Sequence, residues 1–332
     1  MNGDIKMVNN NIVNNRGRTT NTFMFLLVVL LLTGCAGPKG FRMEFESGKS
    51  NDLQKMRELG AEQASTPLPG EDLPEITGNE YEQLGDALLS KKNYYLAYVH
   101  YEKALKHEPG NNRIEYKKGL ALLLGDKYDD AIDQFKSVIK KDPEFAKAYE
   151  GIGKAYFEKR DYPQAERYLL HAVKLDPTLW KSHTYIASIH EQRKDYKSAI
   201  ASYQLALDSS PNKGMIYNNI GYAYLLKGDY HRAVFGFKKA LAHRYTNEKV
   251  YNNLGMALAN LEKYDEALQA FIKSGSEAQA FNNLGCILLD KGKLDKAIVC
   301  FEKAIELDPK FYAIAGENLT KAKTLNHGSV LK

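Results

Sequence analysis

A period of 34 residues organises most of this 332-residue chain. Successive copies of one small residue are 34 residues apart, except the last two, which are 30 apart. Each interval has room for two helices of three to four turns and the turn between them. A chain of this kind stacks each unit on its neighbours and has no single core to fill. The seven copies are Gly85, Gly119, Gly153, Ala187, Gly221, Gly255 and Gly285.

Within each unit, apolar and small residues recur at steps of three and four. Those steps give a helix one apolar stripe, and the closing proline stops the second helix of the unit. In the third unit the pattern is Tyr149, Ile152, Gly153, Tyr156, Ala165, Leu169, Ala172 and Pro177. It resembles the tetratricopeptide repeat, W-x2-L-G-x2-Y followed by A-x3-F-x2-A and P. The resemblance implies an all-α, right-handed superhelical solenoid of about seven helix-turn-helix repeats.

The repeat register sets the expected boundaries of the solenoid, which spans 78–325. The sixth unit is four residues short, so its second helix should be about one turn shorter than the others. The fifth unit has Tyr245 where proline is expected. A polar capping helix is expected over 311–325, followed by a disordered tail over 326–332. The repeats are predicted to start near residues 78, 112, 146, 180, 214, 248 and 278.

The amino-terminal segment has the pattern of an export signal. Arg16 and Arg18 precede ten consecutive apolar residues, Phe23 to Leu32. Ten residues rise only about 15 Å as a helix, half the thickness of a bilayer core, so the segment is too short to span a membrane. It fits the hydrophobic region of a signal peptide over 1–34, with translation starting at Met1 or Met7.

The run Leu32-Thr33-Gly34-Cys35 resembles the bacterial lipobox, in which the cysteine is acylated and the signal is cut before it. The resemblance implies a covalent lipid on Cys35, whereas the other interpretations are an ordinary signal or a buried apolar strand. In such lipoproteins an aspartate directly after the acylated cysteine usually retains the protein in the inner membrane. Ala36 occupies that position here, which favours the outer membrane with the body of the protein in the periplasm. Residues 35–77 are rich in proline and are predicted to be a flexible tether.

In tetratricopeptide repeats the first helix of each unit lines the inner groove. The resemblance therefore implies that unit positions 2, 5, 6, 9, 12 and 13 meet ligands. A ladder of asparagine amides, which both donate and accept, would clamp the backbone of an extended peptide. The alternative is that these asparagines only cap or solvate their helices. The predicted groove residues are Asn218, Asn219, Tyr222, Asn252, Asn253, Met256, Asn282 and Asn283, with Cys286 at position 9 of the last unit.

No catalytic or metal motif survives inspection. His190-Glu191 opens like a zinc-protease motif, but Lys194 stands where the second histidine is required, and His183 and His190 fall on the packing stripe of their helix. Three cysteines exclude a disulfide-built scaffold and a four-cysteine metal site, and pairing of Cys286 with Cys300 is left open. A net charge of +5 is too small for a nucleic-acid footprint. We therefore expect a protein that is not an enzyme and has no cofactor besides the lipid.

The combination of acyl anchor, tether and repeats resembles outer-membrane lipoproteins that help to assemble secretins and pili of the type IV and Flp (tight adherence) systems. The resemblance implies a non-catalytic scaffold on the periplasmic face of the outer membrane, whose partners are proteins or extended peptides, including secretin or pilus components. An alternative is an adaptor that docks cell-wall hydrolases or proteases. An undetected hydrolase is the interpretation from the enzyme class.

Overall fold

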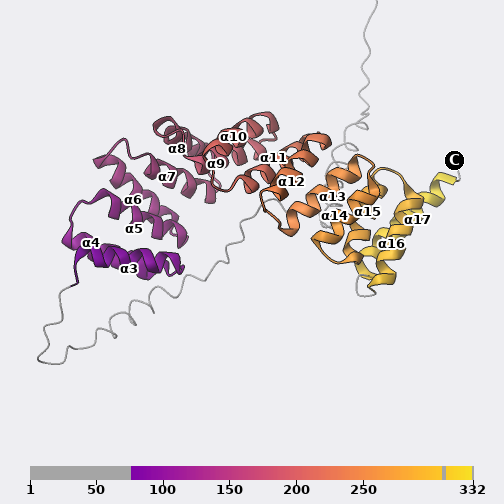
Figure 1. Cartoon of the computed structure of the whole chain (residues 1–332), viewed down its shortest axis with the longest axis horizontal. Helices are drawn as coiled ribbons and strands as arrows, with labels where there is room; N and C mark the ends of the chain where they lie inside the picture. The colour runs from indigo at the N-terminus through magenta and orange to yellow at the C-terminus, as the bar shows by residue number, and fades with distance from the viewer. Residues whose placement is uncertain (1–75, 309–311, 331–332) are drawn as a thin grey trace, which may run out of the picture. The chain divides into compact units, whose positions relative to one another are not determined.

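The computed structural model describes residues 76–308 and 312–330, and its regular secondary structure is helical throughout those ranges. The predicted signal peptide, Cys35 and all but the end of the tether lie outside them. The first helices of the seven units are α3 (Gly78–Ser90), α5 (Asn112–Leu124), α7 (Ala146–Glu158), α9 (Trp180–Gln192), α11 (Lys213–Lys227), α13 (Glu248–Asn260) and α15 (Glu277–Asp290) (Figure 1). Each begins within one residue of its predicted start.

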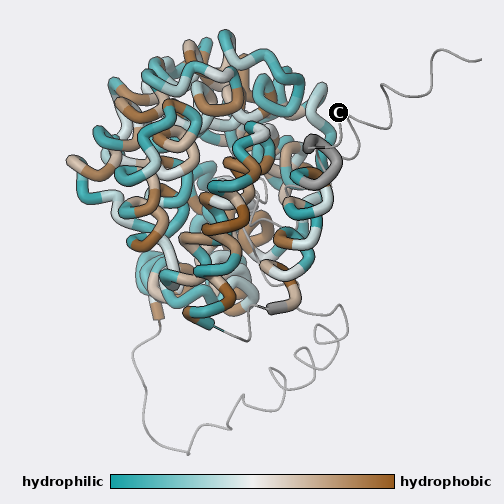
Figure 2. Tube along the Cα trace, turned by 90° about the vertical axis from the view of Figure 1, so that its right-hand side faces the viewer, coloured by the Kyte–Doolittle hydropathy of each residue, from teal (hydrophilic) through white to brown (hydrophobic). Residues whose placement is uncertain are grey.

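The second helices pair with the first helices in sequence order. They are α4 (Tyr94–His107), α6 (Tyr128–Lys141), α8 (Tyr162–Leu175), α10 (Tyr196–Ser209), α12 (Tyr230–Ala242), α14 (Tyr264–Ser274) and α16 (Leu294–Leu307), and α17 (Tyr312–Val330) follows them. Brown and teal stretches, apolar and polar residues, follow one another along the helices that are visible in Figure 2. This is the pattern of helices that bury one stripe against their neighbours.

The chain forms two compact units, and the boundary between them falls at Ala270 and Phe271, inside α14. The larger unit holds α3 to α13, and the smaller unit holds α15 to α17. The predicted shortening of the sixth repeat is confirmed, because α14 has 11 residues whereas α10 has 14. No helix in the described part of the chain is both long and apolar enough to cross a membrane.

The turn inside each repeat depends on one residue in the left-handed backbone region. Residue 15 of every unit has φ between 59° and 82°. In several repeats the residue that follows it caps the second helix with its side chain. The Asp161 carboxylate accepts from the Gln164 N–H at 3.2 Å, and Asp195 does the same for Ser198 at 3.1 Å. The left-handed residues are Lys92, Asp126, Arg160, Lys194, Gly228, Glu262 and Gly292.

The two helices of a repeat touch where the first helix carries its small residue. A Cβ placed on Gly153 would lie 2.6 Å from Cγ of Leu169, and one on Gly119 would lie 2.7 Å from Cε1 of Phe135. Phe135 also packs against Gly151 of the following repeat, where an added Cβ would lie 2.5 Å from its ring. One large side chain per repeat, at position 24, thus holds the paired helices together and, in this case, the next repeat as well.

Two details of the chain differ from the expected pattern. The last helix continues to Val330, so the predicted end of the cap at residue 325 and the disordered tail are wrong for residues 326–330. At the fifth repeat, Tyr245 replaces the expected proline, and an added Cβ on Gly214 would lie 2.6 Å from Cβ of Tyr245. The tyrosine therefore packs against the start of α11, while Arg244 makes the turn with φ of 59°.

We expect Ala165→Leu to destabilise the larger unit by about 1 to 3 kcal/mol, because Ala165 is completely buried and its backbone oxygen faces Gly153. The same change at Ala201, which is exposed on α10, is the matched control and should leave the free energy of unfolding within about 0.5 kcal/mol. Urea unfolding of both variants measures the difference. Equal midpoints for the two variants would contradict the repeat register.

Candidate functional site

The first helices of successive repeats contact one another more closely than the second helices do. Contacts join α5 to α7, α7 to α9 and α11 to α13 in the larger unit. The first helices therefore form the inner side of the stack there. We call the polar and aromatic side chains along this side the first-helix face: Tyr116, Glu150, Lys154, Glu158, Tyr185, Glu191, Asn218, Tyr222, Asn252 and Met256.

The structure buries most of the predicted asparagines of the larger unit. Asn218, Asn219 and Asn253 are 7%, 8% and 8% exposed, and Asn252 is half-buried. The Asn218 amide donates to Oδ1 of Asn219 at 3.3 Å, so these neighbours partly satisfy each other. Tyr222 and Met256, one turn further along, are half-buried. A peptide-binding role for these residues stays a prediction.

In the smaller unit, the capping helix already engages the predicted asparagine of position 5. Asn318 of α17 donates to Oδ1 of Asn282 at 3.2 Å, and its Nδ2 lies 3.5 Å from Sγ of Cys286. Asn282 is only 3% exposed, whereas Asn283 is half-buried. Asn282 therefore has a structural contact within its own unit.

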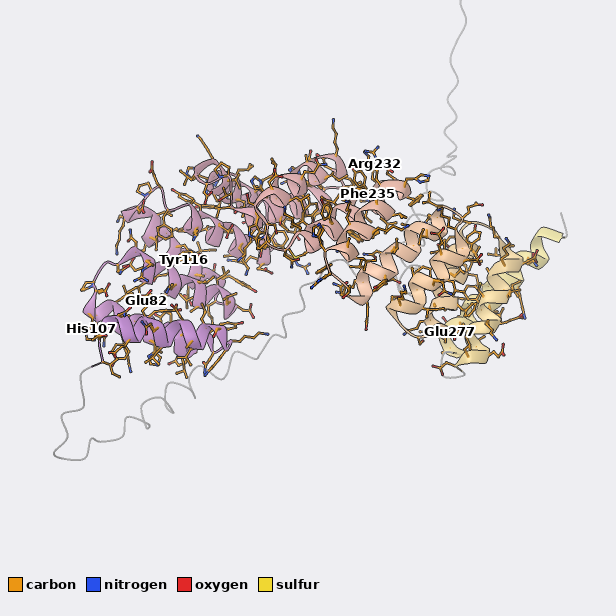
Figure 3. All side chains as sticks on the ribbon, in the orientation of Figure 1. Glu82, His107, Tyr116, Arg232, Phe235 and Glu277 are labelled. Carbon is orange, nitrogen blue, oxygen red and sulfur yellow. The ribbon has the colours of Figure 1, made fainter. Side chains whose placement is uncertain are left out.

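In two other repeats the side chain at position 5 also forms a polar contact with the first helix of the next repeat. Glu82 of α3 is 2% exposed and lies 2.6 Å from Arg113 and 2.7 Å from Lys117, both on α5 (Figure 3). Glu150 of α7 accepts a hydrogen bond from Ser182 of α9 at 2.7 Å. The sequence analysis did not identify these links. For Glu82 a signal was present, since bases occupy positions 2 and 6 of the next repeat.

Two ionisable side chains on α7 are largely buried in the first-helix face. Burial raises the pKa of Glu158 and lowers the pKa of Lys154, and the opposite charges of the two groups offset part of each shift. Oε1 of Glu158 is buried and has no hydrogen-bond partner. Such an uncompensated oxygen is costly to a folded protein.

Glu191, near the end of α9, is the most perturbed carboxylate of this face. Burial raises its pKa to about 7, and the hydroxyl of Tyr203 donates to its Oε2 at 3.1 Å. Ser188, one turn earlier on the helix, lies 3.3 Å from the same hydroxyl. The other oxygen of Glu191, Oε1, is buried and has no hydrogen-bond partner. The sequence analysis treated Glu191 only as part of a failed zinc motif.

Two other residues considered with that motif, His183 and Lys194, have a packing position and a turn position. His183 is 8% exposed, and its Nε2 lies 3.1 Å from the carbonyl oxygen of Pro177. Lys194 is the left-handed residue of the intra-repeat turn. Within the described ranges, no three His, Cys, Asp or Glu side chains are grouped to hold a metal ion.

Cys300 is a free, buried thiol, so the pairing with Cys286 that the sequence left open does not occur. Burial raises the pKa of Cys300 to about 11. A thiol of such high pKa is poorly reactive near neutral pH.

Known repeat models match most of the helical region. Models described as tetratricopeptide repeat match residues 83–144, 116–180, 151–214, 216–242, 249–274 and 278–311. The chain belongs to the tetratricopeptide repeat family. A search of curated protein sequences finds no match. Members of this family bind other proteins, and the repeats make this tetratricopeptide repeat protein a scaffold for protein–protein interactions.

Solved structures of repeat proteins resemble this chain, and one of them shares its fold with a TM-score above 0.5. The C-terminal part of a repeat-containing protein from Cytophaga hutchinsonii has a TM-score of 0.55 at 19% identity, over 71% of this chain and 98% of that one. A repeat protein from Parabacteroides merdae has a TM-score of 0.49 at 15% identity, over 74% of this chain and 98% of that one. PilF from Pseudomonas aeruginosa has a TM-score of 0.48 at 17% identity, over 60% of this chain and 92% of that one.

The raised pKa of Glu191 predicts a specific pH dependence of stability. Because the folded-state pKa lies above the ordinary 4.5, the folded protein binds the proton more tightly than the unfolded chain does. The stability contribution is therefore complete below pH 4.5 and is lost as the pH rises to about 7. Relative to Glu191→Gln, the wild type should lose up to about 3 kcal/mol of unfolding free energy over this interval.

Urea unfolding of both proteins at pH 4.5, 6 and 8 measures this difference. Asp208→Asn, at an exposed carboxylate on α10, is the matched control and should follow the wild type at every pH. A constant difference between the wild type and Glu191→Gln would show that Glu191 is not buried in its ionised form.

Proposed function

We propose that this protein is a non-catalytic scaffold, anchored by lipid on Cys35 to the periplasmic face of the bacterial outer membrane, that aids the assembly of a pilus or secretion complex. The anchor is supported by the lipobox-like run Leu32-Thr33-Gly34-Cys35 after ten apolar residues. Two or three acyl chains hold a protein on a membrane almost permanently, which suits a scaffold for a membrane-embedded assembly.

The first-helix face is the surface that we propose for partner binding, and it carries the proposal. It combines aromatic rings, such as Tyr116 and Tyr222, with amide and charged groups that are only partly exposed. Flat aromatic side chains provide contact area at small entropic cost, while amides pair with the backbone of a bound segment. Repeat stacks present such groups at regular intervals, which matches the regular spacing of an extended peptide.

The binding face is tested by isolating partners from detergent-solubilised membranes of the native host. We expect Tyr222→Ala to reduce partner recovery at least fivefold, because it removes a half-buried ring from the first-helix face. Phe235→Ala is the matched control, since Phe235 is 60% exposed on the second helix α12 (Figure 3). Mass spectrometry of the recovered proteins identifies the assembly.

The possible outcomes separate the proposals. Secretin, pilin or secretion-ATPase components support the pilus assignment, whereas cell-wall hydrolases or proteases support the adaptor role. Equal recovery with both variants, at unchanged helical content by circular dichroism, would show that partners bind a different surface.

The anchor has an independent test. Cys35→Ser should abolish incorporation of labelled palmitate and move the protein from the outer-membrane fraction to the periplasm or the inner membrane, because the serine hydroxyl is not acylated at this site. Cys300→Ser is the matched control and should leave labelling unchanged, since Cys300 is buried. Labelling that persists in Cys35→Ser would refute the anchor.

A further inference from the structure

Three hydrogen-bond acceptors on neighbouring first helices are buried without a donor. They are Oε1 of Glu158 on α7, Oε1 of Glu191 on α9 and Oδ1 of Asn218 on α11. All three belong to the first-helix face, and Asn218 is more than nine-tenths buried. A surface whose unpaired groups are all acceptors is complementary to a ligand that brings donors.

In the first repeat, a carboxylate on the first helix receives donors for both of its oxygens from the chain itself. The hydroxyl of Tyr101, the position-24 residue, donates to Asp86 of α3 at 2.8 Å. Lys117 of the next first helix then lies 2.6 Å from the other oxygen of Asp86. The carboxylate therefore receives one neutral donor from its own repeat and one cation from the next.

The fourth repeat has a similar hydroxyl–carboxylate contact, with the acid one turn further along the first helix, and within the described residues it has no cation from the next repeat. The position-24 residue is again a tyrosine, Tyr203, and its hydroxyl holds Oε2 of Glu191. Glu191 lies one turn further along its helix than Asp86 does, and the next first helix carries Tyr222 one turn beyond the position of Lys117. Arg193, two residues after Glu191, pairs instead with Glu166 of α8 at 2.7 Å. No cation of the described residues contacts Glu191.

We propose that Glu191, together with Asn218 and Tyr222, receives the basic side chain of a lysine or arginine from an extended peptide bound on the first-helix face. This inference rests on the proposed function, because it names the chemistry of the partner of that same face. The ammonium or guanidinium would donate to Oε1 of Glu191 and Oδ1 of Asn218. Tyr222, four residues after Asn218 on α11, would offer its ring to the cation.

The proposed contact needs little rearrangement. The terminal torsion of a glutamate is soft, so the carboxylate can turn to present either oxygen while the Tyr203 hydroxyl holds the other. Glu191 as a whole is only partly buried, as is Tyr222, so both are within reach of a ligand. The bound cation would offset the cost of burying the carboxylate charge.

Binding of a cation requires the ionised carboxylate, so affinity should rise with pH. The titratable groups that interact with Glu191 are Tyr203 on α10 and Tyr222 on α11, while Arg193, two residues further along, is paired with Glu166 of α8. Burial raises the pKa of Tyr222 to about 12 and raises that of Tyr203 well above its ordinary value, so neither phenol titrates near neutrality. With Glu191 titrating at about 7, affinity should be about tenfold higher at pH 8 than at pH 6.

The test is selection of random twelve-residue peptides, displayed on phage, against the full chain purified in detergent. We expect the wild type to enrich peptides that share a lysine or arginine at one position. A synthetic, amino-acetylated copy of the best peptide should bind Glu191→Gln at least tenfold more weakly. Asp208→Asn, which removes an exposed carboxylate from α10, should bind it within about twofold of the wild type.

Replacing the basic residue of that peptide by citrulline, which keeps the shape of arginine without its charge, should weaken binding to the wild type tenfold and change little for Glu191→Gln. Enriched peptides without a shared basic residue would overturn this inference and leave the proposed function intact. Loss of binding on acetylation alone would assign the site to a peptide amino terminus and overturn the side-chain assignment. Failure to enrich any peptide would count against the proposed function itself.

Discussion

The contact between the two helices of each repeat is the constraint on which the rest of the structure depends. In five repeats it places the position-8 glycine against the large side chain at position 24, with a separation that leaves no room for a Cβ on the glycine. Dispersion and burial at this contact fix how closely the helices approach. Because each repeat contacts only its neighbours, this recurring contact also sets the spacing of the side chains on the first-helix face.

Position 24 also connects the core to the face. Where the residue is phenylalanine, as at Phe135 and Phe301, the ring only packs. Where it is tyrosine, the hydroxyl reaches through the repeat to an acid on the first helix, Asp86 or Glu191. One hydroxyl therefore distinguishes a purely structural repeat from one that positions a carboxylate, at no cost to the packing of the ring.

The polar side chains of the first helices divide into two classes by whether the chain itself satisfies them. Glu82, Glu150 and Asn282 each pair with a side chain two helices further along the chain and so link their repeat to the following repeat or to the capping helix. Glu158, Glu191 and Asn218 retain buried oxygens without donors. Unsatisfied groups of this kind reduce stability, and proteins retain them mostly where function requires them. This division, more than the asparagine pattern, marks the part of the face where we propose that a ligand binds.

The sequence by itself determined the repeat, its register and the short sixth unit, because position-8 glycines and apolar steps of three and four are local signals that recur seven times. Helix starts were predicted within one residue for the same reason. The sequence could not show that Asn282 contacts Asn318, since the two residues are more than 30 positions apart. It also could not show that Cys300 stays unpaired, since that depends on the relative directions of two helices. Only the tertiary structure decided that Glu191 is buried beside Tyr203 without a cation, because burial and pairing are properties of the assembled stack, and the chain carries charged residues at many similar positions.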